Sequence, residues 1–309
     1  MEKRRKIIID TDIGDDIDDA FAILLALSSD KFDILGITTV FRNAENRGKI
    51  AKALTASAGV DIPVYVGADT PKDGKTFVFP FESTDERGMP EIPQYFPDMS
   101  ACPLEKTSAE DFILETADKY PGEVSIVALA PFTNVANAIK KSPERFENIQ
   151  EILLMGGDGR CNFAEWNVRC DYESAKTVFD CNVKTTVCGF DITMNSALRA
   201  EEVERVRALK AEPFRLLVKM MDKYVQDYKG ARIPTMHDPL TLCLYLREDL
   251  FELERKKFTV SMAEATKGRL CVCENAQERE IVVKANIPEI NRYMLDLFEQ
   301  WDKKLTAEN

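Results

Sequence analysis

Short β-branched runs alternate with helix-like runs along most of the sequence, and this alternation constrains the fold more than any other feature. Six strand-like runs come first, at 6–9, 33–40, 62–66, 124–130, 152–155 and 185–190. Helix-like runs separate several of them, at 18–29, 45–58 and 133–140. Such alternation predicts an α/β fold with a mostly parallel central sheet flanked by helices.

The last part of the chain has a different pattern. Strand-like runs at 258–263, 269–273 and 281–284 follow one another, and a helix-like run covers 290–301. We therefore expect a small antiparallel C-terminal addition to the sheet. Hydrophobic residues make up 45% of the chain, enough for a sizeable core, and no linker or repeat divides it. Residues 1–309 are predicted to form a single domain.

Residues 68–103 interrupt the alternation. The segment is rich in proline and charged residues and shows no sustained periodicity. Loops of this length inside a compact domain are usually functional or disordered. We predict a long loop or a lid here.

The charge of the chain limits its partners. The formal net charge is −12, and the one basic cluster lies at Lys3–Lys6. A chain this acidic is a poor match for a phosphate backbone, so no nucleic-acid polymer is expected as a partner. A single nucleoside carries no phosphate and stays possible as a small-molecule ligand.

The N-terminus and the cysteines bear on location. The apolar run that precedes Asp10 is too short for the core of a signal peptide, and no apolar stretch is long enough to cross a membrane. The eight cysteines are scattered, and no second pair joins Cys271 and Cys273 to complete a zinc set. We predict a cytoplasmic protein with reduced thiols and no membrane partner.

Six aspartates crowd into ten positions between the first strand-like run and the first helix-like run. They are Asp10, Asp12, Asp15, Asp16, Asp18 and Asp19. Caps and the first helical turn account for two or three of them. A hard divalent cation would offset the repulsion among the rest, because calcium and magnesium both prefer carboxylate and carbonyl oxygens. The sequence therefore predicts a metal site.

Two known metal-binding motifs can be compared with this run. An EF-hand loop needs glycine at its sixth position and glutamate at its twelfth, where this chain has Asp15 and Phe21. A haloacid-dehalogenase-like phosphotransferase also begins with strand-Asp-x-Asp and binds Mg²⁺. Its motif places Thr or Val where this chain has Gly14, and it is kept as an alternative.

A series of short segments carries a resemblance to one family. In chain order they are Asp10-Thr-Asp12-Ile-Gly14, Asp18-Asp19-Ala20-Phe21-Ala22, GITTVFRN ending at Asn43, APFTNVA at 130–136, ILLMGG at 152–157, AEWN at 164–167 and HDPL at 237–240. Each segment is similar to a motif of the nucleoside hydrolase family of the inosine-uridine-preferring type, and the seven keep the family order. The chain thus resembles this family from residue 7 to about 245.

The resemblance implies a Rossmann-like nucleoside hydrolase fold and hydrolysis of a ribonucleoside to ribose and free base. It also implies a bound Ca²⁺, a role in nucleoside salvage and a homodimer or homotetramer. The ligands by the family pattern are Asp12, Asp19, Asp238 and a main-chain carbonyl near Leu129. The insertion of two residues after Gly14 leaves Asp16 as an alternative to Asp18 and Asp19 for the metal and ribose roles.

The same resemblance implies roles in catalysis and substrate binding. Asp12 would be the general base on a calcium-bound water, and His237, the single histidine, would protonate the leaving nitrogen. The expected substrate-binding residues are Asp18, Asn43, Met155, Asn162, Glu165, Asn167 and Tyr228. Asn43 equally fits a helix cap.

Two matters stay open at this point. A non-catalytic ribose- or nucleoside-binding protein is a second alternative, although a pure binder needs neither Asp12 as a base nor His237 as an acid. The segment 68–103 lacks the histidine that many family members carry there. The preferred base is therefore not determined by these residues.

Overall fold

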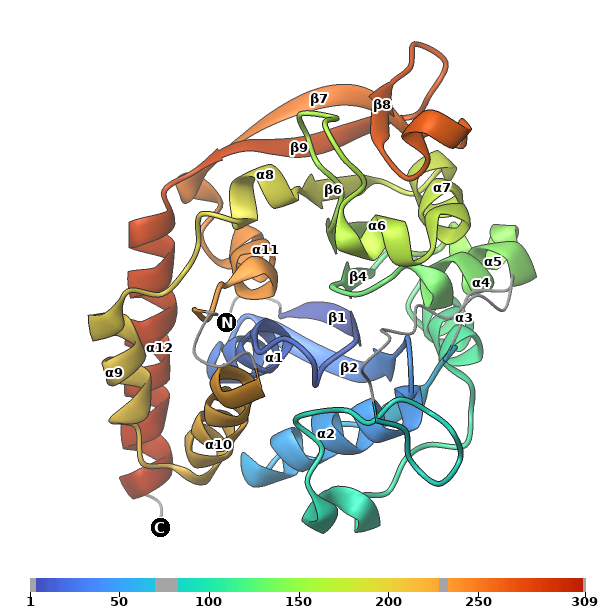
Figure 1. The fold of residues 1–309 in the computed structure, drawn as a ribbon. Helices are drawn as coiled ribbons and strands as arrows, with labels where there is room; N and C mark the ends of the chain where they lie inside the picture. The colour runs from blue at the N-terminus through green and yellow to red at the C-terminus, as the bar shows by residue number, and fades with distance from the viewer. Residues whose placement is uncertain (1–3, 70–82, 228–232, 308–309) are drawn as a thin grey trace.

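The computed structural model describes residues 4–69, 83–227 and 233–307. The strands within these residues form one sheet with the order β3-β2-β1-β4-β5-β6-β9-β7-β8 (Figure 1). Their bounds are β1 Arg5–Thr11, β2 Phe32–Thr39, β3 Val64–Val66, β4 Val124–Ala128, β5 Glu151–Met155, β6 Thr185–Cys188, β7 Phe251–Val260, β8 Leu270–Val272 and β9 Glu278–Ala285. The pairs from β3 to β9 are parallel, and those of β7 with β8 and β9 are antiparallel.

Helices connect the strands and cover the sheet. The α-helices are α1 Asp18–Ser28, α2 Ala44–Ser57, α3 Ala109–Lys119, α4 Thr133–Lys141, α5 Pro143–Phe146, α6 Trp166–Cys170, α7 Tyr172–Asp180, α8 Phe190–Thr193, α9 Ala200–Arg207, α10 Glu212–Asp227, α11 His237–Leu246 and α12 Ile287–Ala307. Three 3₁₀ turns are η1 Pro97–Ala101, η2 Glu248–Leu250 and η3 Glu264–Thr266. The predicted α/β fold with its mostly parallel sheet and small antiparallel group is confirmed.

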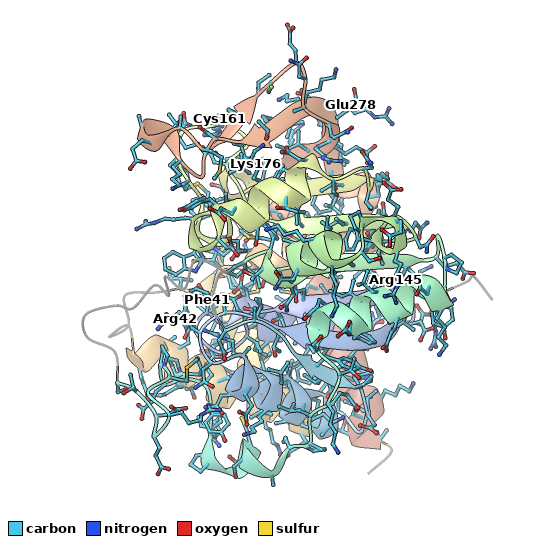
Figure 2. The ribbon with its side chains drawn as sticks, turned by 90° about the vertical axis from the view of Figure 1, so that its right-hand side faces the viewer. Phe41, Arg42, Arg145, Cys161, Lys176 and Glu278 are labelled. Carbon is cyan, nitrogen blue, oxygen red and sulfur yellow. The ribbon has the colours of Figure 1, made fainter. Side chains whose placement is uncertain are left out.

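Alternate residues of the central strands enter two apolar cores, as expected for a sheet buried on both faces. On β1, Ile7 and Ile9 pack with residues of α1, α2, α10, α11 and α12, whereas Ile8 packs with residues of α3, α4 and α7. The first group of helices lies to the left and bottom of Figure 1, and the second lies to the right and faces the viewer in Figure 2.

The antiparallel part differs from the prediction in its extent. β7 begins at Phe251, well before the predicted start at 258; it pairs with β9 over residues 251–257 and with β8 over residues 258–260. Residues such as Glu252 and Arg255 on this strand are charged and exposed, so the apolar alternation that marks a strand is missing from its first half. β9 also pairs with β6 in parallel, at Thr186 and Val187, and so extends the central sheet.

The described part of the predicted long loop lies against the aspartate-rich segment. Within residues 83–96, Thr84 and Pro90 form an isolated antiparallel β-bridge. The main-chain N–H of Gln94 donates to Gly14 O at 3.1 Å. Residues 70–82 of the same predicted loop lie outside the described residues. The role of a lid stays a prediction.

Two further expectations concern the cysteines and the membrane. All eight cysteines are free thiols. Every helix in the described ranges is too short or too polar to cross a lipid bilayer.

Candidate active site

A cavity of about 1150 Å³ opens where the parallel strands end. The loops after β1, β4, β5 and β6 supply much of its wall, together with the first residues of α1 and α11. This is the edge at which open α/β sheets bind ligands. The lining residues that sequence analysis singled out are Asp12, Asp16, Asp18, Asp19, Leu129, Met155, Glu165, Asn167, His237 and Asp238.

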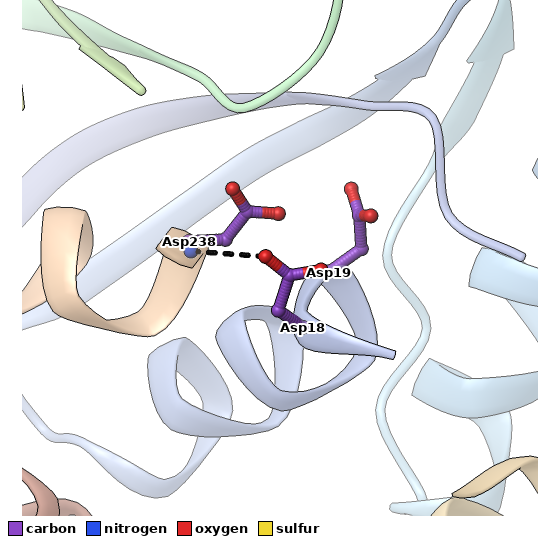
Figure 3. A group of neighbouring side chains, drawn as sticks. All are labelled: Asp18, Asp19 and Asp238. Atoms are coloured by element: carbon purple, nitrogen blue, oxygen red, sulfur yellow. Dashed lines mark hydrogen bonds between the residues drawn. The ribbon is translucent and has the colours of Figure 1, made fainter. Parts of the chain in front are cut away.

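Three buried carboxylates meet in this cavity. Asp18 and Asp19 open α1, Asp238 stands in the first turn of α11, and one carboxylate oxygen from each lies within 4.8 Å of the others (Figure 3). The main-chain N–H of Asp238 donates to Asp18 Oδ2 at 3.3 Å. Thr11, at the end of β1, donates its hydroxyl to Asp19 Oδ1. Two helix N-termini and one strand end therefore fix the trio.

Burial and mutual repulsion change the protonation of these acids. Burial raises the pKa of Asp238 well above its usual range, and the charges of Asp18 and Asp19 raise it further. Burial is also the main reason that the pKa of Asp19 rises to about 6. Asp12 lines the same cavity, and burial followed by the charge of Asp19 raises its pKa as well. A cation among these side chains would favour their charged forms.

A buried arginine holds the loop after β1 through several hydrogen bonds. Arg47 of α2 is fully buried, and its guanidinium donates to Phe41 O at 2.6 Å, Ile13 O at 3.1 Å and Asp15 Oδ2 at 2.7 Å. It also donates to Asp12 O. The carboxylate of Asp15, beside the insertion, is thus paired with a buried positive charge.

Gln94 also holds this loop by hydrogen bonds. Its Nε2 donates to Asp16 O at 2.7 Å and Asp15 O at 3.2 Å, and its side chain is fully buried. Asp16 itself accepts the N–H of Ile17 at 2.8 Å, and its carboxylate lines the cavity. The two inserted residues are therefore built into an ordered turn at the start of α1.

The AEWN segment turns two side chains toward the ends of β4 and β5. Asn167 Nδ2 donates to Leu129 O at 3.0 Å and Met155 O at 3.2 Å. Glu165 caps α6 and accepts from the main-chain N–H groups of Asn167 at 3.0 Å and Gly157 at 2.9 Å. Burial raises the pKa of Glu165 to about 7. These four sequence-predicted residues lie together on one wall of the cavity.

His237 lies at the start of α11, directly before Asp238. Thr193 of α8 lies 2.8 Å from its Nδ1, and the Phe190 ring stacks on the imidazole with a centroid separation of 5.6 Å and an interplanar angle of 15°. Burial lowers the pKa of His237, so its neutral form is favoured near neutral pH.

Sequence reasoning missed an aromatic wall in the cavity. Phe163, Trp166 and Phe190 all line it, and Phe163 packs edge-on against Phe190 at 5.4 Å. Phe163 and Trp166 are among the more exposed large hydrophobic residues. Their positions beside Glu165, and Phe190 at the end of a predicted strand, were the signals that could have found them.

Another missed residue is Arg42, which lines the cavity with only 2% of its surface exposed. Its Nη1 lies 4.0 Å from Asp15 Oδ2. Figure 2 shows it beside Phe41, and both residues have positive φ, 44° and 70°. The signal was present in the sequence, because Arg42 stands directly before the Asn43 of a recognised motif.

Three predicted substrate-binding residues are not brought to the cavity by the described structure. Asn43 accepts the N–H of Asn46 as the cap of α2, and its Nδ2 donates to Pro90 O at 3.0 Å. Asn162 is exposed on the loop after β5, and neither asparagine is among the described lining residues. Tyr228 lies outside the described residues, whereas Tyr224, four positions earlier in the sequence, lines the cavity.

The donor set fits a hard divalent cation. The trio of carboxylates is buried, and the charges of Asp18 and Asp19 raise the pKa of Asp238. Leu129 and Met155, which offer main-chain carbonyl oxygens, line the same cavity. Oxygen donors of this kind suit calcium or magnesium better than the soft metals. The cluster could therefore hold a metal ion.

Sequence comparison identifies relatives over nearly the whole chain. The family model described as inosine-uridine preferring nucleoside hydrolase matches residues 7–293. Probable uridine nucleosidase 2 from Arabidopsis thaliana is 33% identical over 90% of this chain and 88% of its own length. Uridine nucleosidase 1 from the same plant is 35% identical over 82% of this chain and 78% of its own length.

Solved structures agree with the sequence matches. A plant nucleoside hydrolase superposes with a TM-score of 0.83 and 24% identity, over 96% of this chain and 99% of that one. The purine-preferring ribonucleoside hydrolase from Gardnerella vaginalis gives a TM-score of 0.80 and 25% identity, over 97% and 99%. The resemblance seen in the short motifs is confirmed: this chain belongs to the inosine-uridine preferring nucleoside hydrolase family.

Proposed function

We propose that this nucleoside hydrolase cleaves the N-glycosidic bond of a ribonucleoside, releasing ribose and free base, with Ca²⁺ bound at the carboxylate cluster. The observation that carries the proposal is the meeting of Asp18, Asp19 and Asp238 in one cavity with Asp12 and His237. The cavity thus contains a carboxylate cluster suited to a cation, and beside it the carboxylate of Asp12 and the imidazole of His237, which can transfer or share a proton.

Asp12, Asp19, Asp238 and the carbonyl of Leu129 would hold the calcium, with Asp16 as the alternative ligand that lines the same cavity. Asp18 has one oxygen engaged by the N–H of Asp238, and its second oxygen is left to a ribose hydroxyl. When bound there, calcium supplies positive charge that favours loss of a proton from water and attracts the ribose diol.

The chain's own residues divide the remaining work. Asp12 takes the proton from the attacking water as general base. The carboxylates around the sugar favour the positive charge that develops on an oxocarbenium-like ribose. Glu165 and Asn167, which line the cavity beside the ends of β4 and β5, bind sugar hydroxyls and so orient the bond to be broken. His237 assists the departing base by donating from its ring nitrogen.

The test is release of nitrophenol from 4-nitrophenyl riboside, with and without a calcium chelator, for the wild-type protein and for Asp12→Asn. Nitrophenol is a good leaving group, so the assay examines the ribose and metal half of the site alone. We expect turnover that chelation abolishes, that added calcium restores and that the variant lacks. A folded, calcium-loaded protein with no turnover would overturn the proposal and leave the non-catalytic binding role.

Calcium binding has a readout of its own. Isothermal titration of the chelator-treated protein with Ca²⁺ and with Mg²⁺ should show one site that prefers calcium. Preference for magnesium would contradict the choice of metal and leave the hydrolytic reaction to be judged by the riboside assay.

The names of the relatives guide the choice of natural substrates. Two relatives bear the name uridine nucleosidase, and a third, from Shewanella woodyi, is named a pyrimidine-specific ribonucleoside hydrolase. We propose uridine as the first natural substrate to test, with inosine beside it. The nucleoside-salvage role, the cytoplasmic location, the single domain and the homodimer or homotetramer stay predictions.

A further inference from the structure

The contact between Thr193 and His237 joins two separate helices beside the cavity. Thr193 ends α8 and His237 begins α11, and Thr193 Oγ1 lies 2.8 Å from His237 Nδ1. Nδ1 is thereby engaged within the protein. Nε2 is the ring nitrogen left to meet a substrate.

The direction of this hydrogen bond follows from the atoms available. A neutral imidazole has one N–H and one acceptor nitrogen, and a threonine hydroxyl has one hydrogen to donate. Thr193 is fully buried, and His237 Nδ1 is the one hydrogen-bond partner of its Oγ1 in the described part of the chain. If Nδ1–H were the donor, the buried hydroxyl hydrogen would lack an acceptor, which is unfavourable. The hydroxyl therefore donates and Nδ1 accepts.

Phe190 keeps the ring in this orientation. Its side chain comes from the first residue of the same short helix that carries Thr193, and it stacks on the imidazole face. Phe163 packs edge-on against Phe190. A flip of the imidazole would place carbon opposite the Thr193 hydroxyl and lose the hydrogen bond, so α8 determines both the plane of the ring and the identity of its free nitrogen.

We propose that Thr193 is a positioning residue that holds His237 in the tautomer with hydrogen on Nε2 and presents this N–H to the leaving base. The inference rests on the proposed function and deepens it. As the bond from the ribose carbon to the base breaks, its electron pair moves onto the base, and the Nε2–H donates a hydrogen bond to the atom that gains negative charge. No proton leaves the ring in this step: a hydrogen bond from His237 replaces the proton transfer that the resemblance implies for this residue, and the base takes its proton from solvent afterwards.

This role predicts a dependence on the leaving group. Uridine has a poor leaving group that needs the hydrogen bond, whereas 4-nitrophenyl riboside has a good one that does not. Thr193→Val keeps the shape of the side chain and removes the hydroxyl, and Thr193→Ser keeps the hydroxyl. Thr241→Val is the matched control, because Thr241 is equally buried and donates to the main-chain oxygen of His237 at 3.1 Å instead of to the ring.

The experiment measures kcat/KM of each variant on both substrates. Thr193→Val should lose about tenfold to a hundredfold on uridine and stay within about threefold of wild type on the nitrophenyl riboside. Thr193→Ser and Thr241→Val should stay within about threefold on both. His237→Ala should show the same selective loss, and Thr193→Val added to His237→Ala should cause no further loss, because the two residues act as one unit.

Equal losses on both substrates, or additive losses in the double variant, would overturn the positioning role. Unchanged uridine turnover in Thr193→Val would overturn it too. If the protein hydrolyses inosine and not uridine, the same comparison is made with inosine as the substrate that has the poor leaving group. Failure of the proposed function itself is recognised separately, because the wild-type protein would then release no nitrophenol.

Discussion

The main-chain N–H of Asp238 donates to the carboxylate of Asp18 at 3.3 Å, across 220 residues of sequence (Figure 3). The bond joins the N-terminal turns of α11 and α1, whose free N–H groups carry partial positive charge. Two helix N-termini therefore converge on the carboxylate trio and offset part of its repulsion. The rest of the repulsion is what a bound cation would relieve.

Replacing one member of the trio should stabilise the metal-free protein and weaken its response to calcium. Asp18→Asn removes a buried charge, so in chelator we expect an unfolding temperature higher by roughly 2 °C, the equivalent of about 1 kcal/mol. Thermal unfolding in chelator and in excess calcium measures both effects. The exposed Asp30→Asn should leave both unchanged. A variant that is less stable in chelator, yet keeps the full calcium shift, would contradict this account of the trio.

Calcium affinity should rise with pH. Burial, aided by neighbouring carboxylates, raises the pKa of Asp19 from 3.8 to about 6. The metal-free fold thus holds this proton more tightly than the unfolded chain does. Protonation of Asp19 therefore stabilises the metal-free fold below about pH 4, and this stabilisation is lost as the pH rises through 6. Calcium must displace the proton, so affinity at pH 5 should be about tenfold lower than at pH 8. Calorimetric titration at the two pH values checks this, and equal affinities would refute it.

Gln94 should matter for the metal although it does not line the cavity. Gln94→Ala leaves the carbonyls of Asp15 and Asp16 without their donor, which should lower the free energy of unfolding by about 1–3 kcal/mol. Because these carbonyls belong to the turn before Asp18, calcium should also bind more weakly. Urea unfolding and calcium titration test both effects. The exposed Gln150→Ala serves as the control, and a loss of stability without any change in calcium affinity would limit Gln94 to a structural role.

Arg47→Met should be among the most destabilising single substitutions in the chain. Arg47 is fully buried, and its removal leaves Asp15 and three or more carbonyls without their donor. A loss of about 3–5 kcal/mol is expected in urea unfolding. Arg255→Met provides the comparison: its side chain is 69% exposed and pairs with surface glutamates, so it should cost less than about 1 kcal/mol. Similar losses for both variants would show that the loop after β1 does not depend on the buried guanidinium of Arg47.

The central sheet could be predicted because its strands are buried on both faces and contain uninterrupted apolar runs, as at 126–128 in β4 and 152–155 in β5. β7 was underestimated for the opposite reason. Its first half, from Phe251, is made by pairing with β9 and leaves charged side chains in solvent, so its sequence lacks the period of a half-buried strand. Pairing between distant segments leaves little trace in local sequence.

The residues of the candidate site likewise fall into those that local sequence predicts and those that only the fold reveals. Acidic and amide residues such as Asp19, Glu165 and Asn167 stand in short motifs at strand ends, and the structure places them in one cavity. Asn43 stands in such a motif too, yet its side chain is engaged by the segment 83–90, a contact that only the folded loop creates. Thr193 lies outside every recognised motif, because its importance depends on the approach of α8 to α11.

The position of β9 has a consequence for the protein during its synthesis. This strand is late in the chain but inside the sheet, between β6 and β7. Until residues 278–285 leave the ribosome, β6 and β7 both present unpaired edges, and open edges invite pairing with other chains. A chain truncated before Glu278 would keep Asp18, Asp19 and Asp238 and still expose the unpaired edges of β6 and β7. Aggregation is therefore the expected fate of such fragments, even when every residue of the candidate metal cluster has been made.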